Sequence, residues 1–415
     1  MNSRMRLVRP ATVLVSLGAL AVAGLLSAPA QASGPPAPYQ TVVDGLRNPR
    51  GLTMSYDGKL FVAEGGEGGS VCFPGASPEG GGDLCAGLSS RISRINPGTG
   101  SRADFVTGLV SLDGPLFAVG ATGVAARNNQ VFGLMGGSTA FVPPASACGG
   151  GPACRALVRA AKAQLGHLLV GGSRRHDDRL APRAGGSVWR QDVGSANYQW
   201  VVDNKDTVGL GNPAYQPGWA DNPDFQPGDA NPYALAALRG GTYSVDGGSN
   251  TLTWVPNSGA PRVVAAFPNP DPATANAYDS VPTCVAPVGD KVVVADLNGQ
   301  IFVVDGSSVT VAPARVKSVG GAFLVAAGGC DANRKGRVFI SDIFGGGVVR
   351  LSLRTMTLRW VRPPGTLNFP SGVALGDHGA LYVANNSVCP SFPTPVAPDN
   401  PCGGVSGSVV RIDRW

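Results

Sequence analysis

Polar side chains recur at one position of a repeated β-hairpin, and they are the residues of this sequence best suited to bind a ligand. Six copies of the hairpin follow one another, and their second strands end at Glu64, Met135, Asp246, Asp296, Asp342 and Asn385. Two further asparagines, Asn48 and Asn231, directly precede the proline that opens their own copies. In an antiparallel hairpin the start of the first strand lies beside the end of the second. We therefore expect all these residues around one mouth of the molecule.

The chemistry of these side chains supports two interpretations. In the first they form the polar floor of a ligand site, made by Glu64, Asp246, Asp296, Asp342, Asn385, Asn48 and Asn231. Clustered carboxylate and amide oxygens also suit Ca²⁺. In the second interpretation each side chain accepts hydrogen bonds from the backbone of its own turn. The sequence leaves both interpretations open.

Catalytic chemistry is harder to assign. The chain has three histidines, His167, His176 and His378, and neither a G-x-S-x-G nor an H-E-x-x-H motif. The glycine-rich runs 65–69 and 80–82 have no following Lys-Ser/Thr pair, so they are not phosphate loops. We assign no catalytic residue, and the sequence does not decide whether the protein is an enzyme.

The hairpin repeat predicts the elements that position these residues. The segments NPRGLTMSYDGKLFVAE (48–64) and FPSGVALGDHGALYVAN (369–385) share Pro-x-Gly, a short apolar strand, a turn and a second strand. A third strand follows in every copy, predicted at 187–191 in the second copy, and a fourth follows in all but the last, predicted there at 198–202. The segment YQTVVDGL (39–46) supplies the strand that the last copy lacks. We predict an all-β, six-bladed β-propeller, closed by this N-terminal strand completing the last blade.

The predicted propeller is a single domain over residues 33–415. Its blades are expected at about 46–111, 112–204, 229–270, 278–317, 318–365 and 367–415, the last completed by 39–46. Long insertions follow the second strand in copies one, two and six, at 65–90, 136–185 and 386–407, and 205–230 precedes copy three. One helix is predicted from Cys154 to Leu169. The insertions should wall the same mouth as the polar ring, where loops on a rigid scaffold commonly build binding sites.

The N-terminus predicts export. Three arginines, an apolar run from Ala11 to Leu26 and the sequence Ala30-Gln31-Ala32 form a Sec signal peptide over residues 1–32, cleaved after Ala32. Removing those arginines leaves 30 Lys and Arg against 27 Asp and Glu. This small net charge favours neither nucleic acid nor an anionic membrane as a partner. The mature chain has no apolar run that could span a bilayer, and we expect a secreted monomer.

Eight cysteines in an exported chain indicate disulfide bonds. Short spacings pair Cys72 with Cys85, Cys148 with Cys154, and Cys389 with Cys402. Elimination then leaves Cys284 to pair with Cys330.

The order of these motifs resembles the ScyD/ScyE family of exported, NHL-like propeller proteins. The resemblance is carried by NPRGL and DGKLFVAEGG within 48–66, by 229–252, by VPTCVA at 281–286 and by 367–385. It covers nearly all of the mature chain and implies a six-bladed propeller outside the cytoplasm. The family has no established reaction, so no catalytic residue follows from it.

More distantly, the repeats are similar to gluconolactonase and paraoxonase propellers, which bind Ca²⁺ in their channel through Glu, Asp and Asn. That resemblance implies a Ca²⁺ set of Glu64, Asp342, Asn231 and Asn48 and a Ca²⁺-dependent lactonase or esterase activity. The asparagines here do not share one register, and His378 falls in a hairpin turn at the opposite face. An acid–base partner for such a hydrolase is therefore missing from the mouth.

Three hypotheses about function result. The first is a secreted protein that binds a small ligand or partner at the loop-decorated mouth. The second is the Ca²⁺-dependent hydrolase. The third is a non-catalytic scaffold for protein interaction, in which the polar ring has only a structural role.

Overall fold

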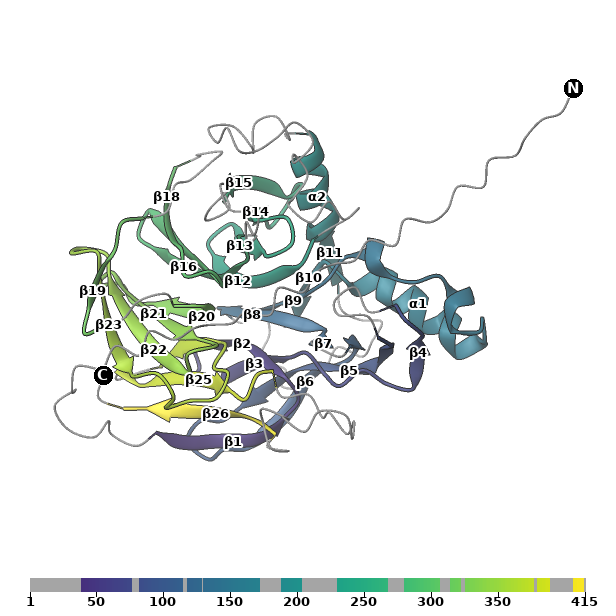
Figure 1. The fold of residues 1–415 in the computed structure, drawn as a ribbon, viewed down its shortest axis with the longest axis horizontal. Coiled ribbons are helices and arrows are strands. Elements are labelled where there is room, and N and C mark those ends of the chain that lie inside the picture. Colours follow the sequence, from purple (N-terminus) through teal and green to yellow (C-terminus); the bar gives the residue numbers. More distant parts are fainter. Residues whose placement is uncertain are drawn as a thin grey trace, which may run out of the picture.

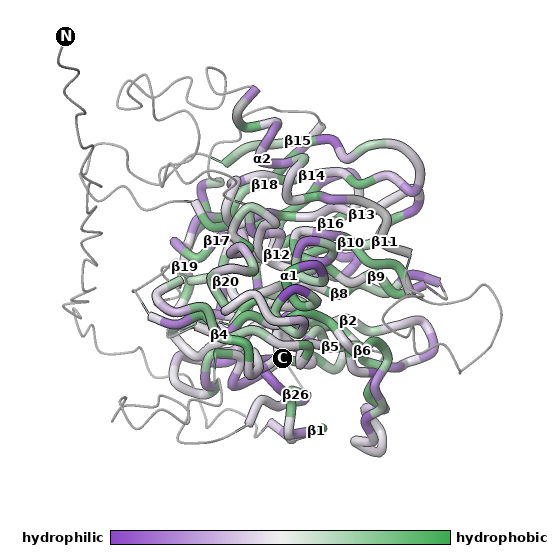
Figure 2. Tube along the Cα trace, turned by 90° about the vertical axis from the view of Figure 1, so that its right-hand side faces the viewer, coloured by the Kyte–Doolittle hydropathy of each residue, from purple (hydrophilic) through white to green (hydrophobic). Residues whose placement is uncertain are grey.

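The computed structural model describes residues 39–76, 82–114, 118–128, 130–171, 188–203, 230–267, 280–306, 314–321, 325–376, 379–388 and 406–413. These residues form six small sheets, or blades, arranged in a ring (Figure 1). Hydrophobic stretches follow the strands through the middle of the molecule, whereas hydrophilic stretches gather at turns on its outside (Figure 2). The predicted all-β, six-bladed propeller is confirmed.

The blades follow the chain in order. Blade 1 contains β2 (Pro49–Met54), β3 (Leu60–Glu64), β4 (Val71–Phe73), β5 (Leu84–Ile95), β6 (Arg102–Asp113) and β7 (Ala118–Val119). Blade 2 contains β8 (Ala121–Arg127), β9 (Gln130–Met135), β10 (His167–Gly171) and β11 (Val188–Asp192). Blade 3 contains β12 (Pro232–Leu238), β13 (Gly241–Asp246), β14 (Thr251–Pro256) and β15 (Arg262–Ala266).

The second half of the ring repeats this plan. Blade 4 contains β16 (Pro282–Val288), β17 (Lys291–Asp296) and β18 (Ile301–Asp305). Blade 5 contains β20 (Ala327–Ala332), β21 (Arg337–Asp342), β22 (Gly347–Ser352) and β23 (Thr357–Arg362), with β19 (Lys317–Val319) parallel to β23. Blade 6 contains β24 (Val373–Leu375), β25 (Leu381–Asn385), β26 (Gly407–Ile412) and β1 (Gln40–Leu46).

The ring is closed by the N-terminal strand. Strand β1 pairs antiparallel with β26, with Gln40 opposite Arg411 and Thr41 opposite Val410. Figure 1 shows this as the purple first strand beside the yellow last strand. The pairing covers an edge of blade 6 that would otherwise expose unpaired backbone groups, and the predicted closing strand is confirmed.

Hydrophobic side chains fill the spaces between neighbouring blades. Within the described residues six core clusters occur, and each joins two adjacent blades. The cluster between blades 4 and 5, for example, contains Ala295 and Ile301 from one and Ile340 and Leu351 from the other. A blade buries both of its faces only when it has a neighbour on each side, so the closed ring satisfies all six blades.

The inner strands contact one another around the axis in the order β2, β8, β12, β16, β20, β24 and back to β2. Glycine is required where their backbones approach most closely. A Cβ on Gly372 would lie 2.3 Å from the Arg50 carbonyl oxygen, and one on Gly51 would lie 2.7 Å from the Val124 amide nitrogen. The Pro-x-Gly motif of the repeat therefore reflects the contact of adjacent inner strands.

Blade 2 differs from the sequence prediction. Its third strand is β10, and residues 188–192 form the fourth strand β11, because β10 pairs with β9 on one side and β11 on the other. The predicted strand at 198–202 is wrong: these residues belong to helix α2 (Val193–Asp203), which packs against β14 and β15 of blade 3. With β11 as its fourth strand, the blade needs no further one.

The predicted helix of blade 2 is too long at its C-terminal end. Helix α1 spans Pro152–Gln164 and is followed by Gly166, whose φ of +74° ends the helical conformation before β10 begins. Its buried face, including Leu157 and Ala161, joins the core cluster between blades 1 and 2. Two short 3-10 helices, η1 (Thr139–Phe141) and η2 (Ala145–Cys148), precede it.

Three of the four predicted disulfides are confirmed, Cys72–Cys85, Cys148–Cys154 and Cys284–Cys330. The fourth, Cys389–Cys402, lies outside the described residues, as does the signal peptide. Cys284–Cys330 joins the inner strands β16 and β20 and thus links blades 4 and 5. In the described part of the chain, no helix is both long and apolar enough to cross a membrane.

Candidate functional site

The six residues predicted to end the second strands do end them. They close β3, β9, β13, β17, β21 and β25 and therefore lie at one end of the propeller, which we call the mouth face. All six are buried: Glu64, Met135, Asp246, Asp296, Asp342 and Asn385. Met135 is the apolar member, and it belongs to the core cluster that also contains residues of helix α1.

Asp246 shows how the polar members are used. Its Oδ1 accepts hydrogen bonds from the backbone amides of Asn231 at 2.7 Å and of Gly248 and Ser249 at 3.0 Å. Its Oδ2 accepts a bond of 2.9 Å from Nδ2 of Asn197 in helix α2. The carboxylate thus connects the segment entering β12, the turn leaving β13 and the helix from blade 2.

The other ring members bind the backbone in the same way. Asp296 Oδ1 accepts from the amides of Asn298 and Gln300, and its Oδ2 accepts from the Ser280 hydroxyl. Asp342 accepts from Gly345 N at 3.0 Å, and Asn385 Oδ1 accepts from Asn368 N at 2.8 Å. Burial raises the pKa of Asp296 to about 6, although these hydrogen bonds oppose the change. The second interpretation of the ring, backbone turn chemistry, therefore describes these contacts.

Glu64 is held by side chains as well. Its carboxylate pairs with the Arg91 guanidinium at 3.0 and 3.1 Å, accepts from the amide of Arg47 at 2.8 Å and is bonded by the Ser93 hydroxyl. Bidentate pairing with Arg is among the stronger hydrogen-bonded arrangements. A cation at Glu64 would have to compete with this arginine.

The predicted Ca²⁺ set has few oxygens left for a cation. Glu64 and Asp342 accept the bonds described above, and Asn231 Oδ1 accepts from Gly137 N at 2.9 Å. Asn48 Oδ1 has no partner. Ca²⁺ takes about six to eight oxygen ligands, and the calcium set stays a prediction. Among the described residues no group of three or more His, Cys, Asp or Glu is placed to hold a metal.

Asn48 is part of a second polar group, formed around the glycine-rich segment that leaves β3. Its Nδ2 donates to the carbonyl of Gly66 at 2.7 Å, whereas its buried Oδ1 is unpartnered. Glu67, in the same segment, pairs with Arg47 at 3.4 Å. Asp113, at the end of β6, has a second buried, unpartnered oxygen, Oδ1. We call Arg47, Asn48, Glu67 and Asp113 the blade-1 rim.

The glycines allow this segment to pass between the rim residues. A Cβ on Gly68 would lie 2.6 Å from Cβ of Asp113, and one on Gly66 would lie 2.6 Å from the Ser111 hydroxyl. Both glycines have positive φ, +85° for Gly66 and +62° for Gly68. The hydroxyls of Ser89 and Ser111 accept from the amides of Glu67 and Gly68, each at 2.9 Å. The segment is therefore fixed, and it presents Glu67 beside Asp113.

Burial, and secondly the charge of Glu67, raise the pKa of Asp113 to about 6. The blade-1 rim thus combines two carboxyl groups, one of which titrates close to neutral pH, with two acceptor oxygens that lack donors. Such a group accepts hydrogen bonds from hydroxyl or ammonium groups, or coordinates a cation.

The central channel offers little additional space. It is lined by residues of all six inner strands, among them Gly51, Thr122, Tyr233, Thr283 and Cys330, and it encloses about 40 Å³. Small-molecule pockets occupy about 300–1,000 Å³. The channel is therefore too narrow for a ligand of that size.

Most of the blade-1 rim was not predicted from the sequence. Asn48 was among the predicted site residues, whereas Arg47, Glu67 and Asp113 were not. Asp113 lies at the end of a fourth strand that extends beyond the repeat unit, so the repeat does not point to it. The sequence feature that could have indicated the rim is Glu67, the single charged residue within the glycine-rich run 65–69. Two of the three histidines, His176 and His378, lie outside the described residues.

Comparison with known proteins found similarity to solved structures alone. No family model and no curated protein sequence matches the chain. Similar solved structures include a putative oxidoreductase (glucose dehydrogenase) from Thermus thermophilus, with 16% identity, a TM-score of 0.46 and coverage of 90% of this chain and 99% of that one. A streptogramin B lyase has 10% identity and a TM-score of 0.42, covering 90% and 96% of the two chains. The Malassezia sympodialis allergen Mala s 1 has 13% identity and a TM-score of 0.46, covering 79% and 88%.

The class that the fold defines is the six-bladed β-propeller, as the six sheets and the closing strand establish.

Proposed function

We propose that this chain is a secreted binding propeller of the ScyD/ScyE type, which holds a small, donor-rich ligand at the blade-1 rim. Secretion is supported by the predicted signal peptide and by three disulfide bonds. The sequence motifs quoted above support the family. No catalytic step is part of the proposal.

The observation that carries this proposal is the pair of buried oxygens without donors, Asn48 Oδ1 and Asp113 Oδ1. Leaving a buried polar atom unpaired costs about 1–3 kcal/mol. A ligand donor that reaches either oxygen recovers part of this energy, and because both atoms are buried, the rim must open for the donor to enter. The Glu67 carboxylate beside them accepts a further bond, so a ligand with several hydroxyl groups matches the rim.

The walls of the rim are fixed before binding. Strands β4, β5 and β6 extend above the mouth face, and the Cys72–Cys85 disulfide ties β4 to β5. Helix α1 packs against β5 and β6. These contacts brace the strands that surround the rim, which reduces the conformational entropy lost when a ligand binds.

The test is a titration of the disulfide-bonded mature protein with cellobiose, trehalose and Ca²⁺, by calorimetry and by the melting temperature. A ligand that binds the native state alone raises the melting temperature. We expect Asn48→Gly and Glu67→Gln each to weaken binding about tenfold, as the loss of one or two hydrogen bonds predicts. Glycine accepts the positive φ of Asn48, +51°, so this change removes the side chain with little backbone strain.

The matched control is Asn128→Gly. Asn128 also has a positive φ, +52°, but it lies exposed in the β8–β9 turn at the opposite end of blade 2. Binding of a disaccharide that survives the control and is lost in Asn48→Gly supports the proposal. A response to Ca²⁺ alone, lost in the same variant, supports a cation site at the rim instead. No response to any of the three contradicts a ligand site of this chemistry.

A second candidate is docking of an extracellular protein on the mouth face. Phe344, in the β21–β22 turn at this face, is 68% exposed, and Leu88 on the extension of β5 is 53% exposed. The polar ring residues bond mainly to backbone groups, which is consistent with the structural role that a protein-binding scaffold would give them. Absence of a response in the titration favours this candidate.

A further inference from the structure

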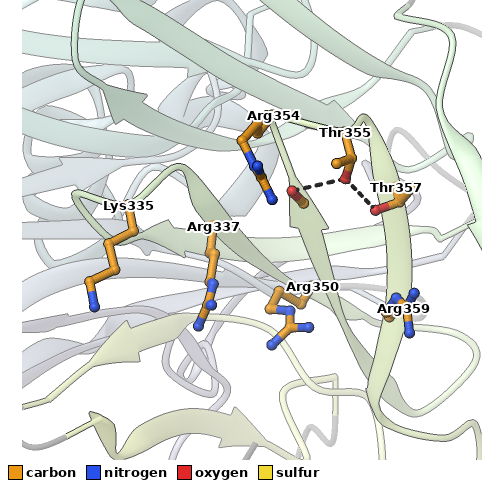
Figure 3. A pocket seen from close by; sticks show the side chains of 8 residues that line it. Lys335, Arg337, Arg350, Arg354, Thr355, Thr357 and Arg359 are labelled. Carbon is orange, nitrogen blue, oxygen red and sulfur yellow. Dashed lines mark hydrogen bonds between the residues drawn. The ribbon is translucent and has the colours of Figure 1, made fainter.

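Blade 5 carries a group of cations that neither the repeat nor the blade-1 rim explains. Lys335, Arg337, Arg350, Arg354 and Arg359 line one cleft, together with Ser352, Thr355 and Thr357, and no carboxylate lines it (Figure 3). The cleft lies at the end of blade 5 opposite the mouth face, because Lys335 and Arg354 occupy the β20–β21 and β22–β23 turns. We call this group the blade-5 cleft.

Strand register brings these residues together. Arg350 of β22 lies directly opposite Arg359 of β23, and Ser352 lies between Arg337 of β21 and Thr357 of β23. Residues that face each other across a sheet project from the same side of it. In Figure 3 the side chains of Lys335, Arg337 and Arg350 extend in the same direction. Three strands and two turns therefore place five positive charges around one space.

Within the part of the chain that the structure describes, no carboxylate pairs with these charges. Elsewhere in the described chain Arg91, Lys291 and Arg411 each pair with a carboxylate. None of the five cations of the blade-5 cleft makes an ion pair or a side-chain hydrogen bond within the described residues. Asp331, two strands from Arg350, directs its carboxylate to the backbone amides of Ala332 and Leu375.

The uncompensated charges affect one another. Burial, and then the charges of Arg337 and Arg359, lower the pKa of Arg350. Repulsion of this kind destabilises the folded protein, and a bound anion relieves it. Surface cations held close together without counter-charges are typical of sites that receive one from a ligand.

The cleft also offers hydroxyl donors. Thr355 Oγ1 is 3.0 Å from Ser352 Oγ and 2.8 Å from Thr357 Oγ1, which forms a row of three hydroxyls beside Arg354 (Figure 3). The cleft has a volume of about 340 Å³, within the range of small-molecule sites. Guanidinium groups bind phosphate and sulfate oxygens through two parallel hydrogen bonds.

We propose that the blade-5 cleft binds a small oxyanion that carries two or more phosphate or sulfate groups. A single phosphate neutralises at most two of the five positive charges, whereas a ligand with several such groups can reach Arg337, Arg350 and Arg359 together. The site is independent of the blade-1 rim, since it lies on another blade at the opposite end of the propeller.

The experiment titrates the disulfide-bonded mature protein with tripolyphosphate and, in a second arm, with a sulfated disaccharide, by calorimetry at constant ionic strength. The variant is Arg350→Gln with Arg359→Gln. Each lost charge-assisted contact is expected to weaken binding roughly 10- to 150-fold. The control is Arg239→Gln with Arg262→Gln, which removes the same charge from exposed positions on blade 3.

Binding of either probe that is lost in the blade-5 variant and kept in the control supports the proposal, and the tighter probe identifies phosphate or sulfate as the source. Equal loss in both variants shows a general charge effect and overturns it. Absence of binding to both probes at millimolar concentration also overturns it. The melting temperature without ligand separates misfolding from lost binding: relief of repulsion should leave it unchanged or raise it in the blade-5 variant.

Discussion

Asp113 combines two features that disfavour its charged form: a buried carboxylate oxygen without a hydrogen-bond donor, and the neighbouring acidic side chain of Glu67. Both favour the protonated form, which explains a pKa of about 6. The polar ring residues differ, because their side-chain oxygens accept hydrogen bonds from backbone amides and, in Glu64, Asp246 and Asp296, also from neighbouring side chains. At the residue scale, carboxylate and amide side chains therefore have two roles. Around the ring they accept hydrogen bonds that hold turns in place, and at the blade-1 rim Asn48 and Asp113 each keep an oxygen without a donor.

The pH dependence of stability tests this account of Asp113. Its folded-state pKa is raised above the ordinary value of 3.8, so the folded protein holds a proton that the unfolded chain releases. Its contribution to stability is fully present below about pH 4 and is lost as the pH rises to about 6. We expect Asp113→Asn to flatten the fall in the free energy of unfolding across this window, measured by urea titration at several pH values. Glu67→Gln should flatten it partly, and identical slopes in wild type and Asp113→Asn would contradict the assignment.

At the scale of elements, the inner strands approach one another so closely at some positions that only glycine fits. Gly51 of β2 and Gly372, which immediately precedes β24, each face the backbone of the neighbouring inner strand. The first and last copies of the repeat have Pro-x-Gly at these positions, where a Cβ would meet backbone atoms of the neighbouring blade. The narrow channel, about 40 Å³, is a direct consequence.

Gly372→Ala is expected to destabilise the protein by about 1–3 kcal/mol, the range for overpacking a well-packed core. The added Cβ would meet the carbonyl oxygen of Arg50 at 2.3 Å, and backbone atoms cannot move aside as a flexible side chain can. Thermal unfolding measures the effect. Gly98→Ala is the control, since its nearest neighbour would be Asn96 Oδ1 at 3.5 Å, an ordinary contact. A melting temperature as high as that of the control would show that the inner strands can separate without cost.

The whole molecule is a ring of blades, and two features link its parts: a strand pairing and a disulfide bond. Strand β1 completes blade 6, so the chain ends meet in one sheet. The disulfide Cys284–Cys330 fastens blade 4 to blade 5 through their inner strands. It closes a segment with a sequence separation of 46 residues, against 13 for Cys72–Cys85.

Replacing Cys284 and Cys330 by alanine should lower the free energy of unfolding by about 2–4 kcal/mol, because a longer closed loop removes more entropy from the unfolded chain. The matched change of Cys72 and Cys85 to alanine should have a smaller effect, since its loop is shorter and lies within blade 1. Urea unfolding of both variants measures the difference. A larger loss from the Cys72–Cys85 pair would show that the link between blades adds little to the ring.

The repeat made the fold predictable. Six hairpins with the same apolar strands and turns, followed by a spare strand at the N-terminus, have few arrangements other than a closed propeller. The strand ends from Glu64 to Asn385 followed from the same alignment of copies. In blade 2 an insertion separates the hairpin from its outer strands, so the alignment assigned 187–191 to the third strand and made a strand of what is helix α2.

What the sequence by itself determined was the position of each polar residue along its strand, since that depends on local periodicity. Tertiary structure alone decided which partner each residue meets. Asp246 binds Asn197 of helix α2, Asn48 keeps an oxygen free, and Arg350 meets Arg337 and Arg359 from adjacent strands. Hydrogen bonds and charge interactions act over a few ångströms in space, whereas the interacting residues can lie far apart in the chain, as Asn197 and Asp246 do with a separation of 49 residues. For that reason the blade-1 rim and the blade-5 cleft become visible only once the strands are in register.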